Sequence, residues 1–322
     1  MRTTMPEPIL DFGRSVDSAL QRAGGIGLAR DAEADYAAAD LALKALSQVG
    51  MYDIDPRDDL DSAAAAAELC RVAGAQAAPC PVVGIILRDP ADKPFALVSD
   101  ECPIIDHAAA APLWRAATLS GDVYEARVVQ RTGSNLSPFA MKVGLTRLDD
   151  EPASPQDVQL ALALSAFQLL GTGQQALELA IKHTREREQF GRPLSGFQVI
   201  RHSVADLSVG LEGLALLCRF ALWQIFTGSS DALPDALAAK HEAQRVVRNV
   251  LRMSQQFHGA AGLADEYDIS VLARHAQPAL RLPTDMTTTL GHLRAAIEER
   301  GFEGLYAPEH AHRAALTTGE AR

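Results

Sequence analysis

Long segments with a helical apolar pattern occupy both ends of the chain, and shorter runs separated by polar turns occupy its middle. Residues 33–49 and 61–77 are rich in alanine and are bounded by glycine and proline, so we predict helices across residues 7–77. Between residues 81 and 148 the apolar runs shorten, and Pro, Gly and Asp separate them. This spacing predicts a small antiparallel sheet built from the runs VVGIILRD, PFALVSD, EARVVQR and MKVGLTRL.

The pattern then returns to long helices, which we place at residues 157–184, 196–227, 234–258 and 286–300. Asp157 is the expected N-cap of the first helix. The Gly191-Arg192-Pro193 break is expected to end that helix, because proline lacks the backbone N–H that the ladder needs. The segment FQVIRHSVADLSVGLEGLALLCRFALW carries apolar residues on more than one face, which is typical of a helix covered on several sides in a bundle.

These patterns divide the chain into three parts. We predict a helical domain over residues 1–80, a β domain over 81–150 and a four-helix-bundle domain over 151–322. Helices and strands are segregated along the chain, so the predicted fold class is α+β, mostly α. The composition agrees, because 48% of residues are hydrophobic but only 5% are aromatic, and long Ala/Leu runs favour packed helices.

Charge and cysteine content argue against several classes of function. The 322 residues carry a net charge of -11, which argues against nucleic-acid binding through a general basic face. The four cysteines form no CxxC pair and no metal-ligand cluster, so we expect no metal site and buried thiols in a reducing cytoplasm at Cys70, Cys80, Cys102 and Cys218. No signal-peptide segment and no run of about 18 apolar residues is found, so we expect a cytoplasmic protein without a membrane span.

A cluster of arginines interrupts this acidic chain in the stretch REREQFGRPLSGFQVIRHSVADL. Arg185, Arg187 and Arg192 lie at the expected C-terminal end of a helix. Either these cations compensate the helix dipole, or their planar guanidinium groups form a phosphate site through paired hydrogen bonds.

A second segment, QQFHGAAGLADEYDI, follows another long helix. On its own it is a helix C-cap followed by a turn. Its small residues would also let the backbone approach a ligand closely, and helix-end amides can bind a pyrophosphate.

Together the two segments resemble the C-terminal domain of acyl-CoA dehydrogenases. The first matches the family's Arg-x-x-Phe-Gly segment and the helix that follows it. QFHGAAGLADEYDI resembles the family's Gln-x-His-Gly-Gly-x-Gly segment, with Ala260 in place of the second glycine. The resemblance is strong over residues 157–275, weaker over 36–85 and only positional over 86–150. It implies an acyl-CoA dehydrogenase-like fold with a truncated N-terminal helical domain and a reduced middle β domain.

In that family the two motifs reach across a dimer interface to the pyrophosphate and adenine half of the neighbour's FAD. The resemblance therefore implies the cofactor FAD and cofactor-binding residues at Arg187, Gln189, Phe190, Gln256 and Gly259. The side chains suit this role, because a guanidinium offers charge-assisted donors to pyrophosphate and an amide can bond an adenine or phosphate edge. The alternative is that these residues only pack at a subunit interface.

The family's chemistry uses a glutamate base that this chain lacks. The two places where the family carries it fall near Ala161 and near Pro283, Thr284 and Asp285. Asp285 is either a shifted, shorter base or the N-cap of the helix DMTTTLGHLRAAIEER, and the cap is favoured because Asp is common there. The strands that line the flavin in the family are missing between residues 81 and 148, and Trp114 is expected in the core. We therefore predict no catalytic residue in this chain.

What remains resembles the short non-catalytic (beta-type) subunit of heterotetrameric α2β2 acyl-CoA dehydrogenases of actinobacterial steroid and cholesterol degradation. That resemblance implies a full-length acyl-CoA dehydrogenase partner, which supplies the catalytic base and the flavin pocket. It also implies α,β-dehydrogenation of a bulky, steroid-derived acyl-CoA and an electron-transfer flavoprotein as acceptor.

Two alternatives stay open: a homomeric dehydrogenase that uses Asp285 or Glu266 as its base, and a flavin-free scaffold subunit. A dinucleotide-binding fold is rejected, because Gly171-x-Gly173 lies inside a helical pattern with no preceding strand.

The remaining polar residues receive structural interpretations. His202 and Asp206 form an i, i+4 pair on one helix face. His258 is placed in the turn beside the nucleotide. Residues 240–242 are interpreted as a solvated face comprising Lys240, His241 and Glu242.

Overall fold

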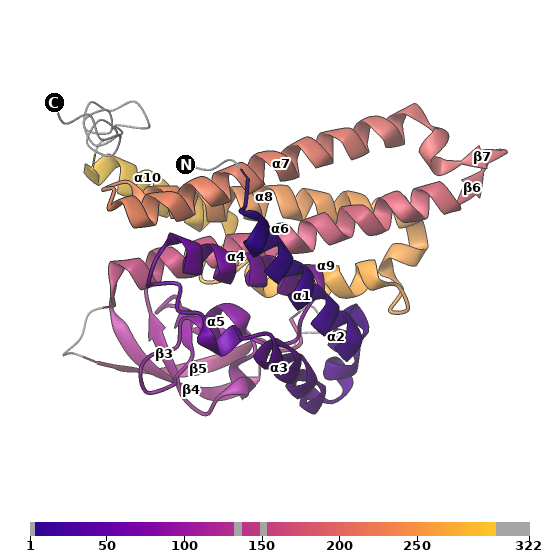
Figure 1. Cartoon of the computed structure of the whole chain (residues 1–322). Coiled ribbons are helices and arrows are strands. Elements are labelled where there is room, and N and C mark those ends of the chain that lie inside the picture. Colours follow the sequence, from indigo (N-terminus) through magenta and orange to yellow (C-terminus); the bar gives the residue numbers. More distant parts are fainter. Residues whose placement is uncertain (1–3, 132–136, 149–152, 301–322) are drawn as a thin grey trace.

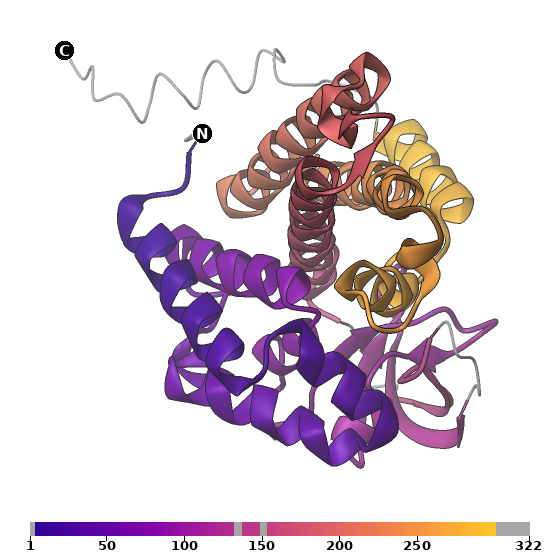
Figure 2. The same cartoon turned by 90° about the vertical axis from the view of Figure 1, so that its right-hand side faces the viewer.

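The computed structural model describes residues 4–131, 137–148 and 153–300. The N-terminal helices and a small sheet lie together on one side of a group of long C-terminal helices (Figure 1; Figure 2). The helices predicted across residues 7–77 are confirmed as α1 (Glu7–Ala23), α2 (Ile26–Ala34), α3 (Ala39–Gln48) and α4 (Leu60–Ala75).

The run VVGIILRD, expected as a strand, instead forms the short helix α5 (Val82–Ile86). A Cβ atom on Gly84 would lie 2.8 Å from the Phe95 carbonyl oxygen and 2.9 Å from the Trp114 ring, so this helix packs directly on the sheet. Tertiary packing here overrides the β propensity of valine and isoleucine.

The five strands of the sheet have the order β1-β3-β4-β5-β2. Their bounds are β1 (Phe95–Leu97), β2 (Ile104–Ile105), β3 (Trp114–Ala117), β4 (Val123–Arg131) and β5 (Met141–Arg147). The expectation of an antiparallel sheet is wrong for one pair, because β1 and β3 run parallel while the other pairs are antiparallel. Strand β2 lies between β1 and β3 in the chain, but it pairs with β5 at the edge of the sheet opposite to β1. No hairpin therefore joins β1 to β3.

The four long C-terminal helices are confirmed as α6 (Pro155–Glu186), α7 (Gln198–Thr227), α8 (Ala232–His258) and α10 (Met286–Arg300). A further helix, α9 (Asp268–Ala279), was not predicted, and it contains Pro278 near its end. Helix α6 runs through the middle, between α4 on one side and α7 and α8 on the other (Figure 2).

The predicted extent of α6, residues 157–184, is close to the observed one, but the predicted signals at both of its ends are wrong. Asp157 does not cap the helix, which begins at Pro155; its Oδ1 accepts a hydrogen bond from Arg57 Nε at 2.6 Å. The helix ends at Glu186, before the Gly191 break, because the chain then forms a two-stranded hairpin of β6 (Glu188–Gln189) and β7 (Arg192–Pro193).

Helices α4 and α6 cross at unusually close range through two glycines. A Cβ atom on Gly171 would lie 1.7 Å from the Arg71 carbonyl oxygen, and one on Gly74 would lie 1.9 Å from the Gln168 carbonyl oxygen. Thr172 Oγ1 also donates to the Gly74 carbonyl at 3.0 Å across the same crossing. The glycines of the Gly171-x-Gly173 stretch therefore serve helix packing. This agrees with the rejection of a dinucleotide-binding fold.

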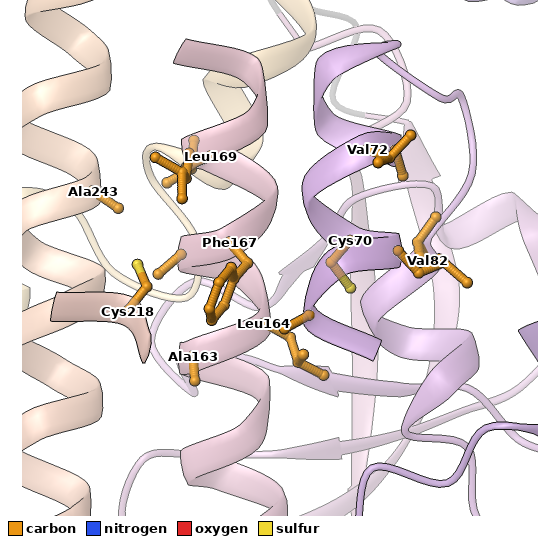
Figure 3. Close-up of a cluster of buried hydrophobic side chains, with 14 of the residues drawn as sticks. Cys70, Val72, Val82, Ala163, Leu164, Phe167, Leu169, Cys218 and Ala243 are labelled. Carbon is orange, nitrogen blue, oxygen red and sulfur yellow. The ribbon is translucent and has the colours of Figure 1, made fainter. Parts of the chain in front are cut away.

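The main core lies around α6, where Leu164, Phe167 and Leu169 meet Cys70 from α4 and Cys218 from α7 (Figure 3). A smaller cluster lies under the sheet and includes Trp114, which is 1% exposed and donates from Nε1 to the Ala108 carbonyl at 3.0 Å. Trp114 is thus a core residue, as expected.

Three of the four cysteines are buried, as predicted. The exception is Cys102, which is exposed in the segment between β1 and β2. The expectation of buried thiols is therefore wrong at this position.

Within the described ranges, α7 alone is long and apolar enough to span a membrane, with a mean hydropathy of 1.5 in its most apolar window. It packs along α6 and α8, and 44% of that window is buried (Figure 1). The absence of a membrane span stays a prediction. Val199 and Val209 of this helix are 71% and 72% exposed, but Arg201, Asp206 and Glu212 are exposed too, so the outer face of α7 is mixed.

Candidate functional site

The β6–β7 hairpin forms the projecting tip of the molecule (Figure 1). Gln189 pairs with Arg192, which leaves Phe190 and Gly191 as the turn, and both have positive φ, 53° and 75°. Positive φ at both central residues is the pattern of a type I′ turn, in which a bulky residue such as phenylalanine is strained. Phe190 is nonetheless 91% exposed, so burial of its ring in this chain does not offset the strain.

The two motifs of the sequence meet at this end of the bundle. His183, one turn before the end of α6, stacks on His258 at the end of α8 with ring centroids 4.3 Å apart. Burial, together with the His258 ring, lowers the pKa of His183. His258 Nδ1 lies 2.7 Å from the Ser254 carbonyl oxygen, which fixes this ring against its own helix. The stacked pair therefore holds the two helix ends together.

The five predicted cofactor-binding residues all lie on the surface of this tip: Arg187, Gln189, Phe190, Gln256 and Gly259. Within residues 4–131, 137–148 and 153–300, the side chains of Arg187, Gln189 and Gln256 have no hydrogen-bond partner and are free to bind a ligand. Gly259 has φ 61° and ψ -137°, a conformation that favours glycine, and its surface is open. These donors fit the pyrophosphate and adenine part of FAD.

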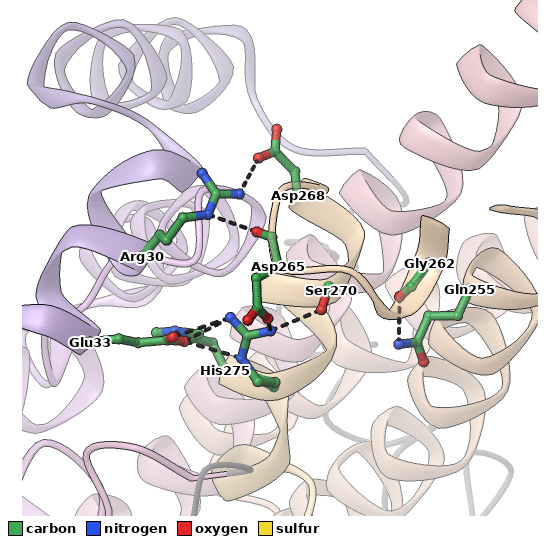
Figure 4. Close-up of polar contacts among 9 residues, drawn as sticks. Arg30, Glu33, Gln255, Gly262, Asp265, Asp268, Ser270 and His275 are labelled. Atoms are coloured by element: carbon green, nitrogen blue, oxygen red, sulfur yellow. Dashed lines mark hydrogen bonds and ion pairs between the residues drawn. The ribbon is translucent and has the colours of Figure 1, made fainter. Parts of the chain in front are cut away.

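The other motif residues have structural partners. The Arg192 guanidinium carbon lies 4.0 Å from the Phe197 ring centroid. This cation–π contact joins the hairpin to the residue that precedes α7. Gln255 Nε2 donates to the Gly262 carbonyl at 3.0 Å (Figure 4). A Cβ atom on Gly262 would lie 2.5 Å from the Gln255 carbonyl oxygen, so this glycine is required for the tight turn.

Asp285 is the N-cap of α10. Its Oδ1 accepts from the backbone N–H of Thr287 at 2.8 Å and of Thr288 at 2.9 Å. These hydrogen bonds, led by that from Thr288, hold the pKa of Asp285 below its usual range, which makes it a weaker base. The favoured interpretation of Asp285 as a cap is confirmed. Glu266, the other carboxylate considered as a base, is exposed.

A cavity of about 150 Å³ lies where α4, α5, the sheet, α6, α8 and α9 meet. Its walls are mostly apolar and include Trp114, Leu162 and Ala276. The polar groups that line it are Ser165, Gln168, Thr172, Asp106, His107, His275 and Lys240.

Lys240 corrects a prediction. It was placed on a solvated face, but it is 1% exposed, and its Nζ donates to Ser165 Oγ at 2.6 Å and to the Ala279 carbonyl at 2.7 Å. Burial lowers the pKa of Lys240 to about 7. Its neighbour His241 is half-buried, with Nδ1 3.1 Å from the Met286 carbonyl oxygen, while Glu242 pairs with Arg245 near the surface.

Two histidines form a second polar group at this cavity. His107 stacks on Phe139 with ring centroids 4.7 Å apart, and Phe139 contacts the edge of His275 at 5.2 Å. Burial, with His275 nearby, lowers the pKa of His107 to about 3, so this ring is neutral at pH 7.

An ion-pair network on the same side joins α2 to α9 (Figure 4). Glu33 accepts from His275 Nε2 at 2.8 Å and pairs with Arg274 at 3.1 Å. Arg274 also binds Asp265, and Arg30 binds Asp268, so the N-terminal helices are clamped to the C-terminal ones.

We expect the Glu33→Gln substitution to lower the free energy of unfolding at pH 7 by roughly 1–3 kcal/mol, because charged hydrogen bonds are lost. The hydrogen bond from His275 and the nearby Arg274 depress the pKa of Glu33 below 4.5. This stabilisation is therefore present above that value and is lost as the pH falls through the lower folded pKa. Urea unfolding at pH 7 and pH 3 measures it. The exposed Asp265, changed to Asn, is the control and should have little effect; an equal loss in both variants would contradict the prediction.

Part of this chain matches a known protein family. Residues 161–280 match the family described as Acyl-CoA dehydrogenase, C-terminal domain. Caffeyl-CoA reductase-Etf complex subunit CarC of Acetobacterium woodii is 33% identical over 109 residues, which are 34% of this chain and 28% of that protein. Acyl-CoA dehydrogenase IpdE2 of Mycolicibacterium smegmatis is 28% identical over 137 residues, 42% of each chain. The chain thus matches well under two thirds of the length of these relatives.

Solved structures are similar to nearly the whole length of this chain. A chain of the ChsE4-ChsE5 complex from Mycobacterium tuberculosis superposes with a TM-score of 0.73 at 17% identity, covering 94% of this chain and 100% of that one. A variant of the Tcur3481-Tcur3483 steroid ACAD gives 0.72 at 18% identity, covering 91% and 98%. Residues 161–280 are therefore an acyl-CoA dehydrogenase C-terminal domain, and the chain as a whole has the acyl-CoA dehydrogenase fold.

Proposed function

We propose that this chain is a subunit of a heteromeric FAD-dependent acyl-CoA dehydrogenase, and that it contributes the pyrophosphate and adenine half of its partner's FAD site. The partner is a full-length acyl-CoA dehydrogenase subunit that supplies the catalytic base. The observation that carries the proposal is the tip, where a strained and exposed Phe190 lies among the unpaired donors of Arg187, Gln189 and Gln256.

The position of the tip supports a role in another subunit. The cavity reaches along α6 to Thr172, and Arg187 directly follows that helix. At about 1.5 Å per residue, the two residues are roughly 22 Å apart along the helix axis. The donors of the tip therefore serve a ligand outside this chain's own cavity.

The cavity itself is a poor site for flavin chemistry. A cavity of about 150 Å³ is the size that holds one benzene molecule, whereas a dehydrogenase must hold a tricyclic flavin ring against an acyl chain. Among the described residues that line it, Asp106 is the only carboxylate, and no glutamate is present. In the proposed enzyme FAD supplies the hydride acceptor, and this chain's residues bind and orient its pyrophosphate and adenine.

Exposed apolar side chains at the tip and on α7 support a subunit interface at this end of the molecule. Phe190, Val199, Val209 and Leu263 are 91%, 71%, 72% and 74% exposed. Phe190 and Leu263 lie at the tip and Val199 lies in the first turn of α7, so these exposed apolar side chains suit a surface that another protein covers. We propose that the full-length partner covers this surface.

The proposed substrate is a bulky, steroid-derived acyl-CoA, and an electron-transfer flavoprotein is the proposed acceptor. The support for the substrate is the likeness of the fold to a structure titled steroid ACAD. The support for the acceptor is the resemblance to the family alone.

We expect the Arg187→Ala substitution to weaken flavin retention in the complex with a full-length homologue by about tenfold to a hundredfold, because a charge-assisted hydrogen bond contributes about 1.5–3 kcal/mol. Flavin absorbance after gel filtration measures the loss. The protein should stay folded, since the Arg187 side chain is exposed. Arg294→Ala on the distant α10, which removes the same charge, is the control. Unchanged flavin retention in Arg187→Ala would count against the cross-subunit role.

A further inference from the structure

The cavity between the sheet and the bundle combines mostly apolar walls with one buried amino group, that of Lys240. Its apolar walls come from α4, α5, α6 and the sheet, while Lys240 reaches it from α8. Lys240 and Trp114 are each 1% exposed, whereas Ile104, Leu282 and Pro283 are half-buried and form the outer part of the lining. The arrangement has the shape expected of a ligand pocket, with apolar walls and a few fixed polar groups.

The hydrogen bonds of Lys240 are incomplete for an ammonium group. An ammonium group has three donors, and the two acceptors of Lys240 are Ser165 Oγ and the Ala279 carbonyl. Both acceptors are neutral, and among the described residues no carboxylate forms an ion pair with Lys240. Because a buried charge is costly without a counter-charge, the pocket favours a ligand that brings one.

Ser165 strengthens this anion site. Its oxygen accepts from Lys240, and its own proton has no acceptor among the described residues, so the hydroxyl is free to donate to a ligand. Thr172 is not free in this way, because its Oγ1 donates to backbone carbonyls of Gly74 and Gln168. Lys240 and Ser165 thus offer two adjacent donors, which match the two oxygens of one carboxylate.

The one carboxylate of the lining sets the orientation of the ligand. Asp106 keeps 29% of its side-chain surface exposed and lies 3.6 Å from the His107 ring, while its Oδ1 is buried without a partner. Burial raises the pKa of Asp106 to about 7, so this carboxyl offers an anionic ligand head no attraction, whereas the Lys240 amine does. The whole cavity measures about 150 Å³, the size that holds one benzene molecule, so only a short acid fits.

We propose that this cavity binds a short amphipathic carboxylic acid, with its carboxylate on Lys240 and Ser165 and its apolar body against Trp114 and Ala276. The site belongs to this chain alone and does not depend on the proposed flavin role, so either proposal can fail without the other. The carboxylate replaces the missing counter-charge of Lys240.

The probe for this site is 6-bromohexanoate, whose bromine quenches tryptophan fluorescence on contact. The full chain with Trp223→Phe leaves Trp114 as the only tryptophan, and Trp114 lines the cavity. We expect saturable quenching by the acid and at least tenfold weaker binding of the uncharged 6-bromohexanamide, because an ionic hydrogen bond is lost. Quenching that does not saturate, or equal affinity for acid and amide, would overturn the proposal.

Two variants locate the bound probe. Lys240→Met, which keeps the length of the side chain without its charge, should remove the preference for the acid over the amide. Ala276→Leu fills the cavity and should abolish quenching by both probes. Saturable quenching that persists in Ala276→Leu would place the probe elsewhere and sink the proposal. If circular dichroism shows that Lys240→Met is unfolded, the comparison of acid and amide with the native lysine decides the question alone.

Discussion

The Gly171→Ala substitution should cost this protein roughly 3 kcal/mol or more of its free energy of unfolding. The added methyl group would lie 1.7 Å from the Arg71 carbonyl oxygen, a backbone atom of α4 that cannot rotate away. The two helices would have to separate, and this would disturb the reciprocal contact of Gly74 with Gln168 and the hydrogen bond from Thr172 to Gly74. The expected loss exceeds that of any surface substitution, because α4 and α6 carry much of the core (Figure 3).

Gly213→Ala in α7 is the matched control. This glycine is also helical, but a Cβ atom there would have no neighbour within 4 Å. Alanine should therefore stabilise the helix by about 0.5–1 kcal/mol, through its higher helix propensity. Urea unfolding of both variants by far-UV circular dichroism measures the difference. Similar stability of the two variants would mean that α4 and α6 do not cross as closely as the structure shows.

The helices of this fold are predictable because they are long and their composition favours one state. Long helical patterns gave α4, α6, α7, α8 and α10 to within a few residues, whereas the helix predicted from residue 33 begins only at Ala39, as α3. Helix α9 was missed because it is short and contains Pro278, which usually ends a helix. Helix α5 was taken for a strand because Val and Ile have high β propensity, and its packing on Phe95 and Trp114 overrides that propensity.

The sequence predicts the residues of the tip better than it predicts those of the cavity. The tip residues come from two continuous motifs at the ends of predicted helices, so the sequence alone could place them together, as the His183–His258 stack now shows. The cavity draws single residues from several elements, and its histidines and Asp106 carry no local pattern. Lys240 did carry a signal, because it shares a helical face with the buried Ala236, Ala243 and Gln244.

We propose that this chain completes a flavin site of which its partner supplies the rest. The tip offers donors for pyrophosphate and adenine, while the cavity is too small for a flavin ring with an acyl chain and has no glutamate among the described residues that line it. Half of a binding site, without the ring pocket, gives too little interaction to retain FAD through purification. Association with the partner adds the other half and raises the affinity of the assembled site.

The most direct test is the flavin content of this chain purified alone and purified after co-expression with a full-length acyl-CoA dehydrogenase homologue. Absorbance at the flavin band, divided by the concentration of each chain, gives the stoichiometry. We expect no bound flavin in the chain alone and about one FAD for each pair of unlike chains in the complex. One flavin per chain in the protein purified alone would contradict it and would favour the homomeric enzyme. A flavin-free complex would show instead that the chain is a scaffold.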